Sequence, residues 1–162
     1  MYKSDTTLIN NDCVFDTSTY TPTIGTIKNY NQFQKIKWNS TAQTATTIFE
    51  NGDTLVLHIG GCIHYSYSAT LYTSINFSNQ NELLVKTSWI ATTFFKPNFN
   101  TRFEYAIKNG LFKQENEYAD TSSVIQYSII EKDTLISNEI LNNIIFTKQN
   151  KGTKIEVSGY IN

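Results

Sequence analysis

The chain has 162 residues and a mass of 18.5 kDa, which fits one domain. Apolar residues make up 40% of it and aromatic residues 14%, which excludes disorder over most of its length. Charged residues make up 17%, the net charge is −1 and Arg102 is the only arginine, so the basic face of a nucleic-acid binder is lacking. No run of about 18 apolar residues occurs, and we expect no membrane-spanning helix.

Residues 1–30 are rich in Thr, Asn and Asp and contain Pro22 and Gly25. We expect an extended N-terminal arm here, lying over a single domain of residues 31–162. Alternation of period two starts at Phe33 and predicts the first strand of that domain.

The segment 50–53, Glu-Asn-Gly-Asp, is the strongest local signal in the chain. Asn-Gly supplies the positive φ values of a two-residue type I′ hairpin turn. The turn would join strands at 46–50 and 54–59, with Gly52 in positive φ. A long half-buried strand with alternating apolar residues follows, from Ile63 to Ile75.

Helical spacing then replaces the alternation. Asn79, followed three residues later by Glu82, is a capping-box pattern that predicts a helix start, and Pro97 stops this helix. A second capping box at residues 101–104 predicts a short helix that ends near Gly110. The expected apolar stripe of the first helix comprises Leu83, Leu84, Thr87, Ile90, Ala91, Phe94 and Phe95.

The last third of the chain returns to strands. Residues 113–120 are polar and acidic and are interpreted as a loop. Residues 124–131 form a predicted strand, and residues 143–148 and 153–161 form a predicted hairpin whose loop has Gly152 in positive φ.

These elements predict an α+β fold. About seven antiparallel strands, a meander plus C-terminal hairpins, form one curved sheet, and two helices inserted mid-chain pack on one face. A roll or sandwich with the helices at one end is the alternative. The apolar spacing in the segment 134–141 fits neither a strand nor a helix, so both remain alternatives for this segment.

Cys13 and Cys62 are the only cysteines. A disulfide between them would close a loop of about 50 residues and contribute roughly 4 kcal/mol in the chain-entropy model. Few charges, much Asn and Thr, and two cysteines favour a periplasmic or secreted protein. The given chain contains no signal sequence, and a lipid anchor on a missing N-terminus fits the same interpretation. A cytoplasmic protein is the alternative.

His58 and His64 flank Cys62 and are weak candidates for metal ligands. A structural zinc site needs four ligands, and the chain has neither a Cys-x-x-Cys pair nor a third histidine. A Cys62 nucleophile with a histidine base would need a nearby basic residue to stabilise the thiolate. We therefore expect no catalytic residue, no metal and no cofactor.

Two groups of acidic residues stand out. Glu115, Glu117 and Asp120 cluster in a predicted loop, and Glu50 and Asp53 flank the predicted hairpin turn. Neither group has the apolar setting that raises a carboxyl pKa for acid–base work. We interpret them as solvated surface, with the loop acids as a candidate rim for a basic partner.

Trp89 and Phe99 fall outside the main apolar stripe and are the candidate exposed anchors for a partner. The sequence favours a non-enzymatic, exported or envelope binding protein, in concrete form an immunity or inhibitor protein that neutralises another protein. Its Asn/Ile/Lys/Thr bias is typical of AT-rich bacterial genomes. The alternative is a small-ligand or sugar-binding protein, or a small enzyme, that uses the concave face of the sheet with Tyr65 and Tyr67 as its lining.

Overall fold

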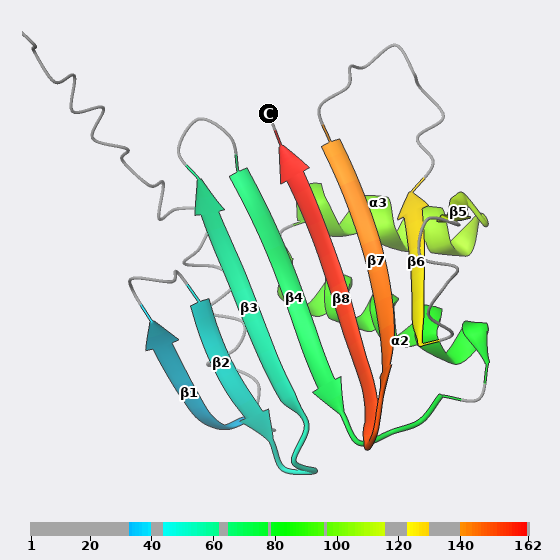
Figure 1. Cartoon of the computed structure of the whole chain (residues 1–162). Coiled ribbons are helices and arrows are strands. Elements are labelled where there is room, and N and C mark those ends of the chain that lie inside the picture. The colour runs from blue at the N-terminus through cyan, green and yellow to red at the C-terminus, as the bar shows by residue number, and fades with distance from the viewer. Residues whose placement is uncertain are drawn as a thin grey trace, which may run out of the picture.

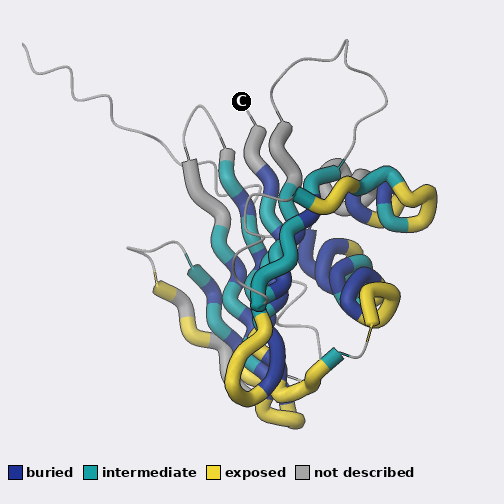
Figure 2. The backbone as a smooth tube through the Cα atoms, turned by 45° about the vertical axis from the view of Figure 1, so that its right-hand side comes forward, coloured by how far each residue is buried: buried dark blue, intermediate teal, exposed yellow. Residues whose placement is uncertain are grey.

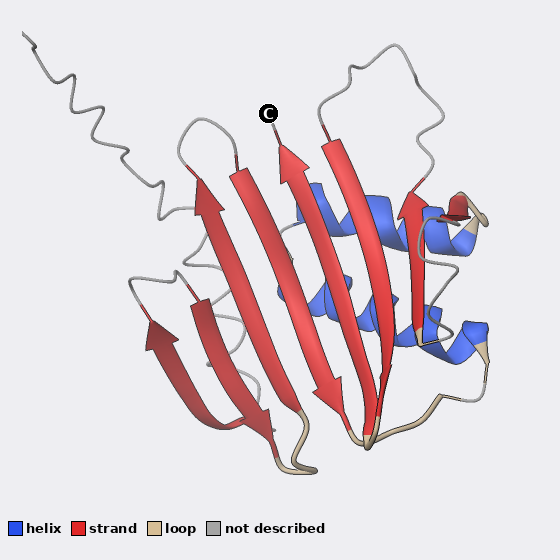
Figure 3. Ribbon diagram, viewed as in Figure 1, coloured by secondary structure: helices blue, strands red, loops and turns tan. Residues whose placement is uncertain are grey.

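Four strands, two helices and four more strands follow one another along the part of the chain that the structure describes (Figures 1 and 3). The computed structural model describes residues 33–39, 44–61, 65–77, 79–95, 97–115, 123–129 and 140–161. The strands are β1 (Phe33–Asn39), β2 (Thr44–Phe49), β3 (Thr54–Gly61), β4 (Tyr65–Thr73), β5 (Phe112–Glu115), β6 (Val124–Ile129), β7 (Ile140–Gln149) and β8 (Gly152–Ile161). The helices are α2 (Gln80–Phe94) and α3 (Pro97–Lys108). The predicted arm at 1–30 lies outside the described residues.

The eight strands form one antiparallel sheet in the order β1-β2-β3-β4-β8-β7-β6-β5. Pairing of β4 with β8 joins the two halves at the centre, from Tyr65 opposite Ile161 to Thr73 opposite Thr153. The sheet is open, with β1 and β5 at its two ends. The predicted α+β fold is confirmed.

The strand β5 lies in the segment 113–120 that was predicted to be a loop, so this prediction is wrong for residues 113–115. Phe112 packs edge-to-face on Tyr127 of β6, with ring centroids 5.6 Å apart. This contact anchors a strand whose remaining residues are polar. The segment 134–141, for which the sequence did not distinguish strand from helix, lies mostly outside the described residues. Its last two residues belong to β7.

Both helices cover the same face of the sheet, and the opposite face carries no helix among the described elements (Figure 1). Figure 2 shows that the buried stretches of sheet and helices face each other. The core comes from alternate positions of the central strands and from the predicted stripe of α2. Its fully buried members include Leu55, Ala69, Leu71, Ile90, Phe94, Phe103, Ile144, Ile155 and Val157.

The ends of the helices follow local capping chemistry. The Asn79 side chain accepts a 3.0 Å hydrogen bond from the Glu82 backbone N–H, which confirms the predicted N-cap of α2. Pro97 follows the end of α2 and is also the first residue of α3, where its missing N–H costs no hydrogen bond. The predicted helix start at 101–104 is therefore wrong by about one turn. Gly110, with φ 65°, ends α3 as predicted.

The β2–β3 hairpin has a three-residue loop, so the predicted two-residue type I′ turn is wrong. The Phe49 N–H donates to the Asp53 carbonyl at 2.9 Å, and the Gly52 N–H donates to the Phe49 carbonyl at 3.0 Å. The Asn51 side chain accepts from the Asp53 N–H at 3.1 Å and stabilises this longer loop. Gly52 has φ 85°, so its predicted positive φ is confirmed.

Candidate functional site

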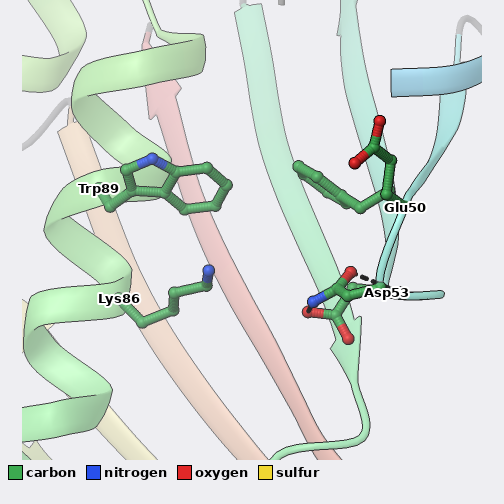
Figure 4. Close-up of a pocket in the computed structure, with 6 residues that line it drawn as sticks. Glu50, Asp53, Lys86 and Trp89 are labelled. Carbon is green, nitrogen blue, oxygen red and sulfur yellow. Dashed lines mark hydrogen bonds between the residues drawn. The ribbon is translucent and has the colours of Figure 1, made fainter. Parts of the chain in front are cut away.

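A cleft of about 260 Å³ lies between α2 and the β2–β3 hairpin (Figure 4). Lys86 and Trp89 project from the helix toward the hairpin, which carries Glu50 and Asp53 on the other side. We call it the hairpin cleft; its lining residues are Phe49, Glu50, Asn51, Asp53, Lys86 and Trp89. Carboxylate, amide, ammonium and aromatic groups therefore meet in one small space.

Asp53 is the fixed acidic group of the cleft. Only 4% of its surface is exposed, so the expectation of a solvated carboxylate is wrong for this residue. Its Oδ2 accepts from the Asn51 side-chain amide at 3.0 Å, and its Oδ1 accepts from the Ser74 backbone N–H at 3.4 Å. Because Ser74 directly follows β4, the second bond ties the hairpin to the central sheet. Glu50 is exposed, as expected.

Lys86 and Trp89 form the helix side of the cleft. The Lys86 ammonium lies 4.0 Å from the centroid of the Trp89 ring, a cation–π contact. Burial lowers the pKa of Lys86, and the negative charge of Asp53 acts in the opposite direction. Phe49 and Phe94 hold the indole at centroid distances of 5.9 and 5.5 Å. The indole is thus oriented by packing on both elements.

A second hollow of about 850 Å³ runs along the outer side of α2, and we call it the α2 groove. It shares Lys86 and Trp89 with the hairpin cleft and is also lined by Phe77, Asn79, Glu82 and Val85. Val85 has 69% of its surface exposed, the largest fraction among the exposed large hydrophobic residues that the structure describes. Val85 and Trp89 are four residues apart and therefore neighbours on the helix surface.

Of the predicted partner-binding residues, the structure describes the side chains of Trp89 and Glu115 and does not bring these two together. Trp89 is half-buried and lines both hollows, whereas Glu115 lies on β5, the strand at the end of the sheet order. Glu115 pairs with Lys113 at 3.7 Å and lines neither hollow. Phe99 belongs to α3, but its side chain is not among those described. Glu117 and Asp120 lie outside the described residues.

The predicted disulfide and the weak metal candidates are mostly outside the described part of the chain. Cys13, Cys62 and His64 all fall there. His58 lies on β3 opposite Thr44 and Ser68, half-buried, on the sheet face away from the helices. Among the described residues, no group of three or more His, Cys, Asp or Glu side chains could hold a metal ion.

The face of the sheet under the helices is filled around Tyr67. Tyr67 is 3% exposed and packs edge-to-face on Phe95, with ring centroids 4.8 Å apart. It therefore belongs to the core and does not line a site on the concave face; the side chain of Tyr65 is not described. No described helix is long and apolar enough to cross a bilayer.

Comparison with known proteins gives no match to a family model, to a curated protein or to a solved structure. The chemistry of the cleft and the groove is therefore the basis for assigning a function.

The sequence interpretation missed Val85 and Lys86, and it misjudged Asp53. A signal for Val85 was present, because an apolar residue outside the buried stripe of an amphipathic helix is a candidate contact residue. Lys86 had no such signal, because lysine is common on the solvated side of a helix. Its position over Trp89 and opposite the hairpin depends on how α2 packs against the sheet.

Proposed function

We propose that the protein is a non-enzymatic binding protein of the bacterial envelope, of the immunity or inhibitor type, that binds a segment of another protein on the α2 groove and the hairpin cleft. The observation that carries this proposal is the pair Val85 and Trp89. An exposed aliphatic side chain lies one helical turn from a half-buried indole, inside a hollow with a polar rim. An apolar centre with a polar rim is typical of protein interfaces.

Charge supports a basic partner segment. The two hollows are lined by the carboxylates of Glu50, Asp53 and Glu82 and by the single ammonium of Lys86. The lining is thus acidic in balance, and a Lys or Arg side chain of the partner would complement it. We therefore expect the partner to present an apolar side chain to Val85 and Trp89, next to a basic residue that faces the hairpin.

Rigidity supports binding through this surface. The Ser74 N–H holds Asp53, and Phe49 and Phe94 hold Trp89, so the two walls of the cleft are positioned before a partner arrives. A preorganised site loses less side-chain entropy on association. An envelope location draws support from the low charge content and from the predicted Cys13–Cys62 disulfide.

Selection of a phage-displayed library of random peptides on the purified protein tests the proposal. We expect enriched peptides to carry Lys or Arg beside an apolar residue. Val85→Asp should weaken their binding by about 2 kcal/mol, because it places a charge at the apolar centre. Glu82→Lys should also weaken the binding of these peptides, because the new lysine would repel their Lys or Arg side chains.

Ile48→Asp is the matched control. Ile48 is also an exposed aliphatic residue, at 40%, but it lies on the sheet face away from the helices. Binding that Ile48→Asp abolishes and Val85→Asp leaves intact would contradict the proposed surface. Enrichment of acidic peptides would contradict the proposed charge of the partner. A hydrolytic turnover that His58→Ala abolishes would favour an enzyme instead.

A further inference from the structure

A separate cavity of about 370 Å³ opens where the start of α2 meets the ends of β6, β7 and β8. Its apolar lining consists of Phe77, Leu83, Ile125 and Phe146. We call it the end pocket. Phe146 is only 2% exposed and Leu83 is 9% exposed, so the lining belongs to the edge of the hydrophobic core. The cavity falls within the usual size range of small-ligand sites, roughly 300–1,000 Å³.

Lys148 is the one charged side chain that lines the end pocket. It is exposed, lies near the end of β7, and forms no ion pair with another described residue. The remaining polar lining groups are small: Asn76, Ser123 and Thr153. An apolar cavity with a single ammonium at its edge is complementary to a molecule with an apolar body and one anionic end.

Two hydrogen bonds fix the polar edge of the end pocket. The Lys148 backbone N–H donates to the Ser123 carbonyl at 2.6 Å, which joins β7 to the start of β6. The Thr153 hydroxyl donates to the Ile75 carbonyl at 2.9 Å, which joins β8 to the segment before α2. Two of the segments that bound the pocket are therefore tied to neighbouring segments.

We infer that the end pocket binds a small aliphatic carboxylate, with the hydrocarbon chain on Phe77, Leu83, Ile125 and Phe146 and the carboxylate on the Lys148 ammonium. This site goes beyond the proposed partner surface and uses different charged residues. A water molecule occupies about 30 Å³ in the liquid, so the cavity holds roughly a dozen groups of that size. Two of these groups are the carboxylate oxygens, so the capacity matches a chain of about ten carbons.

Calorimetric titration of the whole protein with sodium alkanoates, from butanoate to dodecanoate below their micelle concentrations, tests this inference. Each added methylene should tighten the dissociation constant about fourfold, since burying one CH₂ is worth about 0.8 kcal/mol. The gain should stop near decanoate, when the cavity is full. Adsorption on an open surface would show no such limit.

Variants of Lys148 test the charged end. Lys148→Ala should weaken octanoate about two- to fivefold, because an ion pair of an exposed lysine contributes up to about 1 kcal/mol, and should leave octanol unchanged. Lys148→Glu should favour octylammonium over octanoate. Lys151→Ala is the matched control, because Lys151 is exposed in the neighbouring β7–β8 loop and does not line the pocket. Circular dichroism of each variant checks that the sheet is intact.

Several results would overturn the inference. One is the absence of saturable binding for every alkanoate. A second is an affinity that keeps rising through dodecanoate. A third is a loss of octanoate binding that is the same in Lys148→Ala and Lys151→Ala. Equal affinity of the native protein for octanoate and octylammonium would contradict the proposed contact between the carboxylate and the Lys148 ammonium.

Discussion

Among the described glycines with positive φ, Gly152 is the one where an added methyl group should damage the fold most. It has φ 111°, a conformation that L side chains rarely adopt, at the start of β8. A Cβ atom there would overlap the Thr73 carbonyl oxygen and lie 2.7 Å from the Ser74 Cα. The obstacle is backbone, so it cannot rotate away as a side chain would.

Gly152→Ala should lower the free energy of unfolding by about 3 kcal/mol or more. Positive φ costs an alanine about 1–2 kcal/mol, and overpacking adds about 1–3 kcal/mol. Relief of the clash would move β8 off β4 at the Thr73–Thr153 pair, which is part of the central junction of the sheet. For a chain of this length the midpoint of thermal unfolding should fall by roughly 6–12 °C.

Gly52→Ala and Gly110→Ala are the matched controls. Both glycines have positive φ, 85° and 65°, but no atom lies within 4 Å of a Cβ built on either. Each should cost about 1 kcal/mol from backbone strain alone. Urea unfolding followed by circular dichroism measures all three variants. A Gly152→Ala variant no less stable than the two controls would refute the close approach of β8 to the end of β4.

Three further predictions concern stability and covalent structure. Thr47→Val should stabilise the protein by about 1 kcal/mol in urea unfolding, because the Thr47 hydroxyl is fully buried and has no hydrogen-bond partner among the described residues. A destabilised variant would indicate that this hydroxyl is satisfied. Burial raises the pKa of Tyr127, so the folded state keeps a proton that the unfolded state loses, and stability should fall as pH rises above about 10. Tyr127→Phe should reduce that slope, and an identical slope in the variant would refute the assignment. Thiol titration of the denatured, non-reduced protein should find no free thiol if Cys13 and Cys62 are bonded, and two reactive thiols per chain would contradict the disulfide.

Local patterns were sufficient to predict the architecture. The buried residues of α2 follow the 3.6-residue spacing of one helix face, and the Asn79 cap depends on an atom three residues away. Gly52, Gly110 and Gly152 mark the turns through their own backbone preference. Such signals lie within a few residues of the structure that they specify, so the order of strands and helices, except for β5, could be predicted from the sequence.

The predictions that were wrong concern features that depend on contacts between distant segments. The burial of Asp53 requires the Ser74 N–H, 21 residues further along the chain. The strand β5 depends on the contact of Phe112 with Tyr127, across the connection to the next strand. The hairpin cleft exists only because α2 packs beside the β2–β3 turn. Its electrostatics could not be predicted from the spacing of Glu50, Asp53 and Lys86 in the sequence.

Phe77 lies in the lining of both the α2 groove and the end pocket. A partner on the groove and a carboxylate in the end pocket would therefore contact the same side chain from two hollows. Phe77→Ala should weaken both kinds of binding and cannot separate them. Val85→Asp and Lys148→Ala can, because each residue lines only one of the two. If octanoate changes the affinity for a selected peptide in the native protein, the peptide must change the affinity for octanoate by the same factor. Loss of this coupling in Phe77→Ala would identify Phe77 as the contact that links the two sites.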